Sequence, residues 1–263
     1  MSMDLAPPEV HAPVSWIQID FISDLHLSSD TPRTFAAWSD YMRRTPAQAV
    51  FILGDLFEVW VGDDARFDGF EAESASVLRQ SARDRYVAFM AGNRDFLVGQ
   101  QMLNDCGVSP LADPTLLLAF GQRLLLTHGD ALCLADTDYQ SFRAMVRSPA
   151  WQQDFLSQPL EARRLYARQV RAQSEARKRE APLAMDWADV DFPAAATWLA
   201  TAASDTMIHG HTHRPGSESM QPGRTRHVLS DWELDHPPHR AEVLRLDARG
   251  LHRLTLAEAL ATA

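Results

Sequence analysis

The sequence predicts an α/β fold in which a sheet lies between layers of helices. Three observations predict it. Short apolar, β-rich segments recur along the chain, helical patterns separate the first of these segments, and polar residues follow the ends of five expected strands. Strand and helix in alternation are typical of α/β layers, and the carboxyl ends of such strands form the functional edge of a sheet.

The expected elements follow this order along the chain. Strands are expected over 16–23, 49–54, 86–91, 115–120, 123–127 and 206–208, and the helices between the first of them over 32–43, 70–81 and 97–105. From 137 to 200 strand-like runs are nearly absent, and helical patterns occupy 139–147, 151–157 and 160–178. Strands resume near 226–230 and 241–246. We therefore expect one domain over 15–263 with a helical insertion over about 137–200, preceded by a disordered, proline-bearing tail over 1–14.

Composition restricts the class of protein. A chain of 263 residues with 46% hydrophobic residues can bury a sizeable core, and its net charge of −10 argues against sequence-independent binding to nucleic acid. No apolar run approaches the roughly 20 residues that span a bilayer, and the first residues lack the pattern of a secretory signal. Cys106 and Cys133 lie in apolar contexts that indicate buried thiols in a reducing compartment. We expect a cytoplasmic protein that binds no nucleic acid and has no obligate protein partner.

Five expected strands end in polar loops that offer oxygen and nitrogen ligands but no thiolate. The loops are Ser23-Asp24-Leu25-His26, Gly54-Asp55, Gly92-Asn93-Arg94-Asp95, His128-Gly129-Asp130 and His209-Gly210-His211-Thr212-His213. Each loop alone is also compatible with an ordinary surface turn. Together, on one edge of a sheet, they predict a site for hard or borderline divalent metals such as manganese, iron or zinc.

The order of these motifs resembles that of the calcineurin-like metallophosphoesterases over roughly residues 20–213. The resemblance implies a four-layer α/β/β/α sandwich and two metal ions. It implies that one ion is held by Asp24, His26 and His211, that the other is held by Asn93, His128 and His209, and that the Asp55 carboxylate bridges them. His213 receives no ligand role. Asp95 and Asp130 are expected to accept hydrogen bonds from the histidine rings and so orient them.

Arg94 is the main departure from the common pattern of that superfamily. Most members have a histidine after the metal-binding asparagine, where it can protonate a leaving group. An arginine keeps its proton near neutral pH, but its planar fork can clamp two phosphate oxygens. The sequence therefore favours a diphosphate substrate over a simple alkyl ester, with Arg94 and Asp55 as catalytic residues.

Longer segments narrow the resemblance. The stretches FISDLHLS, FILGDLFEVWVGDD, GNRDFLVG, LLLTHGDALCLADTDYQSFR and IHGHTHRP resemble the UDP-2,3-diacylglucosamine diphosphatases of lipid A biosynthesis. That family implies cleavage of UDP-2,3-diacylglucosamine to UMP and 2,3-diacylglucosamine 1-phosphate with two divalent ions, usually Mn²⁺. It also implies substrate contacts from Asn93, Arg94, Asp136, Ser174, Arg177 and His209. The family's substrate-binding lysine has no assigned counterpart here.

Two other functions stay open at this point. One is a general dinuclear-metal phosphodiesterase or nucleotide pyrophosphatase that acts on soluble substrates. The other is a noncatalytic metal-binding scaffold, although such a scaffold need not retain all seven expected ligands.

The expected helix at 160–178 is basic, although the chain as a whole is acidic. From Leu160 to Arg179 the sequence has seven basic residues and two acidic ones. It is either an amphipathic helix packed on the core or a surface for the anionic head groups of a membrane. A substrate with two acyl chains favours the second interpretation and needs an apolar cleft, for which the nearby aromatic residues are Trp151, Phe155, Trp187 and Trp198. We therefore expect peripheral attachment to the cytoplasmic side of the inner membrane.

Overall fold

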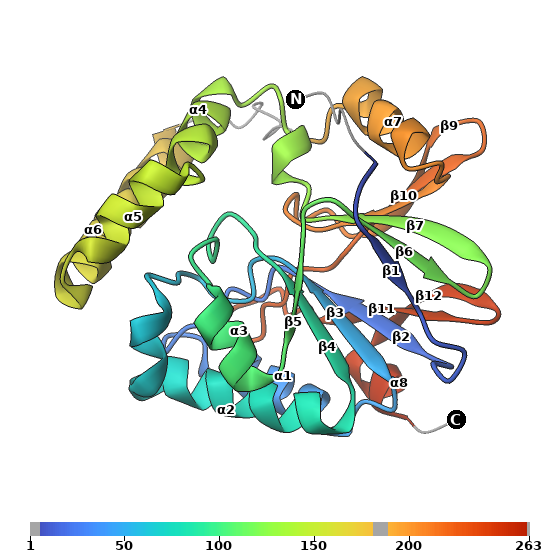
Figure 1. Ribbon diagram of the computed structural model, residues 1–263, viewed down its shortest axis with the longest axis horizontal. Helices are drawn as coiled ribbons and strands as arrows, with labels where there is room; N and C mark the ends of the chain where they lie inside the picture. The colour runs from blue at the N-terminus through green and yellow to red at the C-terminus, as the bar shows by residue number, and fades with distance from the viewer. Residues whose placement is uncertain (1–5, 181–188, 262–263) are drawn as a thin grey trace.

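Two mixed β-sheets packed face to face form the centre of the molecule (Figure 1). The computed structural model describes residues 6–180 and 189–261, and for residues 173–180 the backbone alone. One sheet has the order β12-β11-β2-β3-β4-β5, with bounds Gly250–Thr255, Glu242–Asp247, Ile19–Ile22, Ala49–Leu53, Tyr86–Met90 and Ser109–Leu111. The other has the order β1-β6-β7-β8-β10-β9, with bounds Glu9–His11, Thr115–Ala119, Gln122–Thr127, Thr206–His209, Arg224–Val228 and Gly216–Gln221.

Helices cover the outer face of each sheet. The sheet that contains β2 packs against α1 (Pro32–Arg44), α2 (Gly69–Asp84), α3 (Gln100–Cys106) and α8 (Leu256–Leu260). The sheet that contains β7 packs against α7 (Phe192–Thr201). Short 3₁₀ helices, η1 (Asp63–Phe67) and η2 (Asp130–Leu132), lie in the connecting loops. The expected four-layer α/β/β/α sandwich is confirmed.

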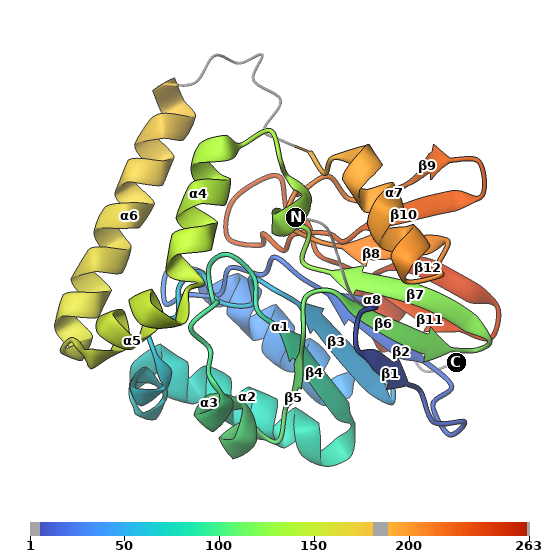
Figure 2. The same ribbon diagram turned by 45° about the horizontal axis from the view of Figure 1, so that its top comes forward.

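The remaining helices form an arm on one side of the sandwich (Figures 1 and 2). They are α4 (Thr137–Val146), α5 (Pro149–Ser157) and α6 (Leu160–Glu180). Of the insertion expected over 137–200, these three helices lie at one side of the sandwich, with Phe155 and Trp151 of α5 packed against its core, whereas α7 returns to it as an outer layer. We call α4, α5 and α6 together the arm.

Strand β3 shows why the strands at the centre are apolar on both faces. All five of its residues are buried. Val50 and Ile52 face the helices, whereas Phe51 and Leu53 face the opposite sheet. Successive side chains of a strand point to opposite sides, so a strand between a helix layer and a second sheet needs apolar residues at every position.

The expectation of a disordered tail over 1–14 is wrong at residues 9–11. These residues form β1, which pairs in parallel with β6, and Val10 packs against the core between the sheets. The short strands β5, β9 and β12 were also not expected from the sequence. Most of their residues are only partly buried or exposed, so they lack the long apolar pattern that indicates an element.

A buried ion pair ties the layers together beneath the loops. Asp20 of β2 accepts hydrogen bonds from Arg245 of β11 through Nε at 2.7 Å and Nη2 at 2.8 Å. The same carboxylate accepts from the hydroxyls of Tyr41 and Thr45, both at 2.8 Å, and Arg245 also donates to the carbonyl of Ala259 in α8. The network joins the two strands to α1 and α8, four residues before the chain reaches Asp24.

We predict that Arg245→Ala lowers the free energy of unfolding by about 3–5 kcal/mol, because it leaves the buried Asp20 carboxylate unpaired. Guanidinium unfolding followed by circular dichroism measures this change. The control is Arg249→Ala, which removes an exposed guanidinium that is paired with Asp247. It should leave the midpoint nearly unchanged, and equal shifts in the two variants would contradict the prediction.

Candidate metal centre

The site forms where strands from both sheets end at the same edge. Strands β2, β3 and β4 run parallel in one sheet, and β7 and β8 run parallel in the other. Backbone bonds fix the loops to one another: the amide of Asp24 donates to the carbonyl of Gly54 at 3.1 Å. The amide of His211 donates to the carboxylate of Asp24 at 2.9 Å, which joins a loop of one sheet to a loop of the other.

Sharp turns of the backbone aim the side chains at this edge. Positive φ angles occur at Asp24 (55°), His26 (48°), Asp55 (52°), His211 (66°) and His213 (52°). Residues other than glycine seldom adopt this conformation, and it persists only where the surrounding structure holds it. Here the hydrogen bonds between the loops hold it, and each turn directs a polar side chain into the site.

Two glycines leave room for the carboxylates. A Cβ atom at Gly92 would collide with the side chain and amide of Asp55, and one at Gly210 would collide with the carboxylate of Asp24 and the hydroxyl of Ser23. A larger residue at either position would displace an expected metal ligand.

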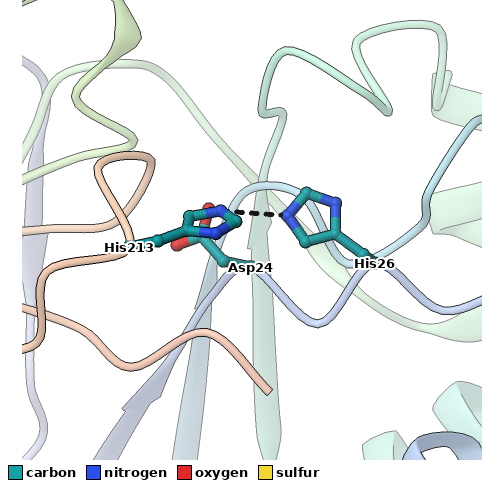
Figure 3. A group of neighbouring side chains, drawn as sticks. All are labelled: Asp24, His26 and His213. Atoms are coloured by element: carbon teal, nitrogen blue, oxygen red, sulfur yellow. Dashed lines mark hydrogen bonds and ion pairs between the residues drawn. The ribbon is translucent and has the colours of Figure 1, made fainter. Parts of the chain in front are cut away.

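Asp24, His26 and His213 form the first cluster (Figure 3). The Nε2 atoms of His26 and His213 lie 3.2 Å apart, and Nε2 of His213 lies 3.4 Å from Oδ1 of Asp24. Asp24 is fully buried. The three donor atoms are close enough to contact one ion.

Asn93, His128 and His211 form the second cluster. Oδ1 of Asn93 lies 3.0 Å from Nε2 of His128 and 2.8 Å from Nδ1 of His211. Oδ2 of Asp55 lies 3.7 Å from Nε2 of His128 and 3.9 Å from Nε2 of His26. The Asp55 carboxylate therefore stands between the two clusters.

The three histidines of the last loop lie in different surroundings. The His213 ring lies beside Asp24 and His26, where His211 was expected, and the His211 ring contacts Asn93. His209 is the last residue of β8, its ring is buried, and Nδ1 lies 2.8 Å from the carbonyl of Gly210. Its Nε2 atom is buried and has no hydrogen-bond partner in the described residues, as a nitrogen left free for a metal would be. The expected assignment of His209 and His211 as metal ligands therefore stays a prediction.

The second ring nitrogen of His128 fixes which of its nitrogens faces the centre. Nδ1 of His128 lies 2.9 Å from the carbonyl of Leu53, an acceptor, so Nδ1 carries a proton and Nε2 is free to bind a metal. Nδ1 of His26 lies 3.2 Å from the Glu58 carboxylate. Glu58 was not expected as a site residue, since one acidic residue between Phe57 and Val59 resembles an ordinary exposed position of a strand.

Asp95 and Asp130 do not orient histidine rings as expected. The Asp95 carboxylate accepts backbone hydrogen bonds from Gly92 and Leu56, both at 2.8 Å, and so holds two loops together. Burial, reinforced by the Asp55 charge, raises the pKa of Asp95 to about 7. Asp130 accepts from the Tyr139 hydroxyl at 2.6 Å and from Nε of Arg143 at 2.7 Å, which anchors the arm.

The electrostatics of the centre favour added positive charge. Burial disfavours the charged imidazole of His128, but the Asp55, Asp130 and Asp24 carboxylates outweigh it and raise the pKa to about 9. For Asp24, burial opposes ionisation, yet His213, His128 and His26 bring the pKa well below its usual range. In the part of the chain that the structure describes, histidines are the cationic partners of Asp24 and Asp55. Histidines can lose their positive charge, so these buried carboxylates lack a permanent cationic partner. Divalent cations would supply that positive charge.

Arg94 lies at the mouth of the centre. Its backbone amide donates to Oδ1 of Asp55 at 2.8 Å, and its Nη1 lies 3.5 Å from Oε1 of Glu58. The Nε atom is buried and has no hydrogen-bond partner in the described residues. An unused donor on a guanidinium beside a metal centre suits an anionic ligand.

The other expected substrate residues belong to the arm. Asp136 is the N-cap of α4, and its Oδ1 accepts from the amide of Tyr139 at 3.0 Å. The Tyr139 ring stacks on His211, with ring centroids 5.9 Å apart. Ser174 and Arg177 lie in the last part of α6, residues 173–180, for which the structure describes the backbone alone.

Comparison with known proteins shows the family to which the chain belongs. The model of the calcineurin-like phosphoesterase family matches residues 17–215. The chain is 44% identical to the UDP-2,3-diacylglucosamine hydrolase of Chromobacterium violaceum over 90% of this chain and 98% of that protein. It is also 44% identical to the protein of the same name from Xanthomonas campestris pv. campestris, over 88% and 96% of the two chains. A solved phosphoesterase from E. coli is similar at a TM-score of 0.44 and 18% identity, over 91% of this chain and 93% of that one. The chain belongs to the calcineurin-like phosphoesterase family.

Proposed function

We propose that the protein hydrolyses the diphosphate of UDP-2,3-diacylglucosamine to UMP and 2,3-diacylglucosamine 1-phosphate, a reaction of lipid A biosynthesis. The observation that carries the proposal is an arginine, Arg94, beside two clusters of metal-type ligands that share the Asp55 carboxylate. The names of the two bacterial relatives support the choice of substrate.

We propose that the site holds two divalent ions, both Mn²⁺. Asp24, His26 and His211 would hold the first ion, and Asn93, His128 and His209 the second, with Asp55 between them; the buried Nε2 of His209, which has no hydrogen-bond partner in the described residues, supports its place in this set. Carboxylate, amide and imidazole donors suit manganese, and the absence of thiolates from both clusters makes softer metals less favourable. Bound divalent ions supply Lewis acidity, which neutralises phosphate oxygens and activates water for in-line attack.

The residues of the chain account for the rest of the reaction. The Arg94 fork would donate to oxygens of the diphosphate and stabilise the negative charge that builds on the departing phosphate. A phosphate leaving group is weakly basic, so it can depart without a proton, and an arginine that cannot give one up is sufficient. Asn93, next to Arg94, would contact the phosphate while it holds the second ion.

We further propose that the protein attaches peripherally to a membrane through the arm, on the cytoplasmic side of the inner membrane. No helix among the described residues is long and apolar enough to cross a bilayer. Leu156, Leu165 and Tyr166 expose apolar surface on α5 and α6, beside the exposed Arg168. Apolar and basic groups together suit a surface of anionic lipids.

Arg163, one of the basic residues of the expected helix, and Trp198, expected near the cleft for the acyl chains, serve the fold instead. Arg163 is almost fully buried and pairs with Asp64, and Trp198 packs in the core between α7 and its sheet. Trp151 and Phe155 stack on each other in α5, lie against Tyr166 and pack on the core of the sandwich. Their part in a cleft for acyl chains stays a proposal. Trp187 lies outside the described residues.

Arg94→Ala should lower turnover of the lipid substrate by about 10²–10³-fold, the usual effect of removing one donor to a transition-state oxyanion. Both metals should remain bound, because the Arg94 side chain touches none of the proposed ligands. UMP release by the purified variant and its metal content are the two measurements. Arg94→Lys keeps the charge without the fork and should recover only part of the rate, and unchanged activity in Arg94→His would contradict the role of arginine.

Removal of metal with a chelator should abolish UMP release, and Mn²⁺ should restore it. The design adds Mn²⁺, Zn²⁺, Mg²⁺ or Fe²⁺ one at a time to the stripped protein, with the lipid substrate in detergent. Brisk hydrolysis of a generic phosphodiester without release of UMP would instead favour a general phosphodiesterase.

The protein should sediment together with vesicles of anionic lipid at low salt. Most of it should stay in the supernatant at high salt, since charge contributes to attachment. Leu165→Glu should weaken sedimentation at both salt concentrations, because it puts a carboxylate on the apolar part of the surface. Protein that stays in the supernatant under all conditions would overturn the proposed attachment.

A further inference from the structure

The Glu58 carboxylate contacts three cationic side chains that come from three different parts of the chain. Oε2 lies 3.2 Å from Nδ1 of His26, in the loop after β2. Oε1 lies 3.5 Å from Nη1 of Arg94, in the loop after β4, and 3.3 Å from Nη1 of Arg171, in α6 of the arm. Oε2 therefore contacts a residue of the first cluster, and Oε1 contacts the two arginines.

The backbone holds this carboxylate in place. The amide of Glu58 donates to the carbonyl of Leu27 at 3.0 Å, within a short bridge between Leu27 and Phe57. Two residues on, the amide of Trp60 donates to the carbonyl of Arg94 at 3.3 Å. The Glu58 side chain is only 11% exposed. Its position is set by the same loops that carry His26 and Arg94.

The charges around Glu58 are arranged to keep it ionised. Burial opposes its charge, but His26, Arg94 and Arg171 outweigh burial and lower its pKa from the usual value. Without the carboxylate, two guanidinium groups would face each other and the metal-binding His26 across a partly buried space, where their repulsion is poorly screened. Arg94 would then be driven away from the centre.

We propose that Glu58 is a positioning residue that couples the metal centre to the phosphate clamp. One oxygen holds the His26 ring, whose Nε2 faces Nε2 of His213 and Oδ2 of Asp55, and the other holds Arg94 at the mouth of the site. This role rests on the proposed function for its Arg94 part only, because the His26 part concerns metal binding alone. Partners that fix a ligating histidine through its second nitrogen commonly contribute 10–100-fold to metal affinity or activity.

The test compares Glu58→Gln with the matched control Glu71→Gln. Glutamine keeps the shape and an acceptor oxygen but removes the charge. Glu71 of α2 also faces an arginine of α6, Arg164, at 3.8 Å, and it contacts neither cluster. Three quantities are measured in each variant: Mn²⁺ affinity of the stripped protein by calorimetry, KM and kcat for UMP release, and the melting temperature.

We expect Glu58→Gln to bind Mn²⁺ about 10-fold more weakly and to raise KM by a similar factor, while the control keeps wild-type values. The increase in KM should disappear in an Arg94→Ala background, since Glu58 acts on the substrate through Arg94. Glu58→Asp, in which the carboxylate is one methylene shorter, should recover part of the metal affinity, and it replaces Glu58→Gln if that variant does not fold.

A Glu58→Gln protein with wild-type Mn²⁺ affinity and wild-type KM, but a lower melting temperature, would overturn the proposal and leave Glu58 a purely structural residue. A wild-type protein that binds Mn²⁺ yet releases no UMP would overturn the proposed function instead. The calorimetric comparison would then still decide whether Glu58 positions His26.

Discussion

The burial of two carboxylates, Asp24 and Asp55, where the sheets meet is the constraint on which the site depends. An ionised carboxylate out of water is strongly unfavourable unless positive charge or hydrogen bonds compensate it. Here the compensation comes from imidazoles and backbone amides, and the raised pKa of His128 shows how strongly the centre attracts a positive charge. A proton on His128 and a divalent ion beside it would satisfy the same carboxylates, so metal binding should displace protons from the site.

The sandwich fixes the loops from below, and this holds the buried charges next to the groups that compensate them. Asp20 and Arg245 bind β2 to β11 and to two helices, so the strand that delivers Asp24 is held rigidly. Asp95 accepts backbone hydrogen bonds from Gly92 and Leu56, and so ties the loop after β3 to the loop after β4. Because the bond partners are backbone groups, the spacing of Asp55 and Asn93 does not depend on the metal.

The layers and the functional edge could be predicted from the sequence, but not every residue of the site. Central strands such as β3 are apolar at all positions and were found, whereas β1 has three residues, of which only Val10 packs on the core, and was taken for disordered tail. His209, His211 and His213 alternate, so the pattern limits the ligands to members of this set without showing which residue ends the strand. Glu58 was missed for a different reason. Its partners are 32, 36 and 113 residues away in sequence, and only the fold brings them together.

Polar contacts join the arm to the loops of the metal centre. Nη2 of Arg147 donates to the carbonyl of Gly92 at 2.8 Å, Arg143 pairs with Asp130, and Arg171 reaches Glu58. Hydrogen bonds and ion pairs are directional, so they set the angle of the arm while its exposed apolar residues, such as Leu165, stay available. A substrate with a diphosphate and two acyl chains needs both properties in one place. Arg171 and Leu165 belong to the same helix, α6. The contact of Arg171 with Glu58 therefore fixes the position of α6, which would meet the acyl chains, relative to Arg94, which would meet the phosphates.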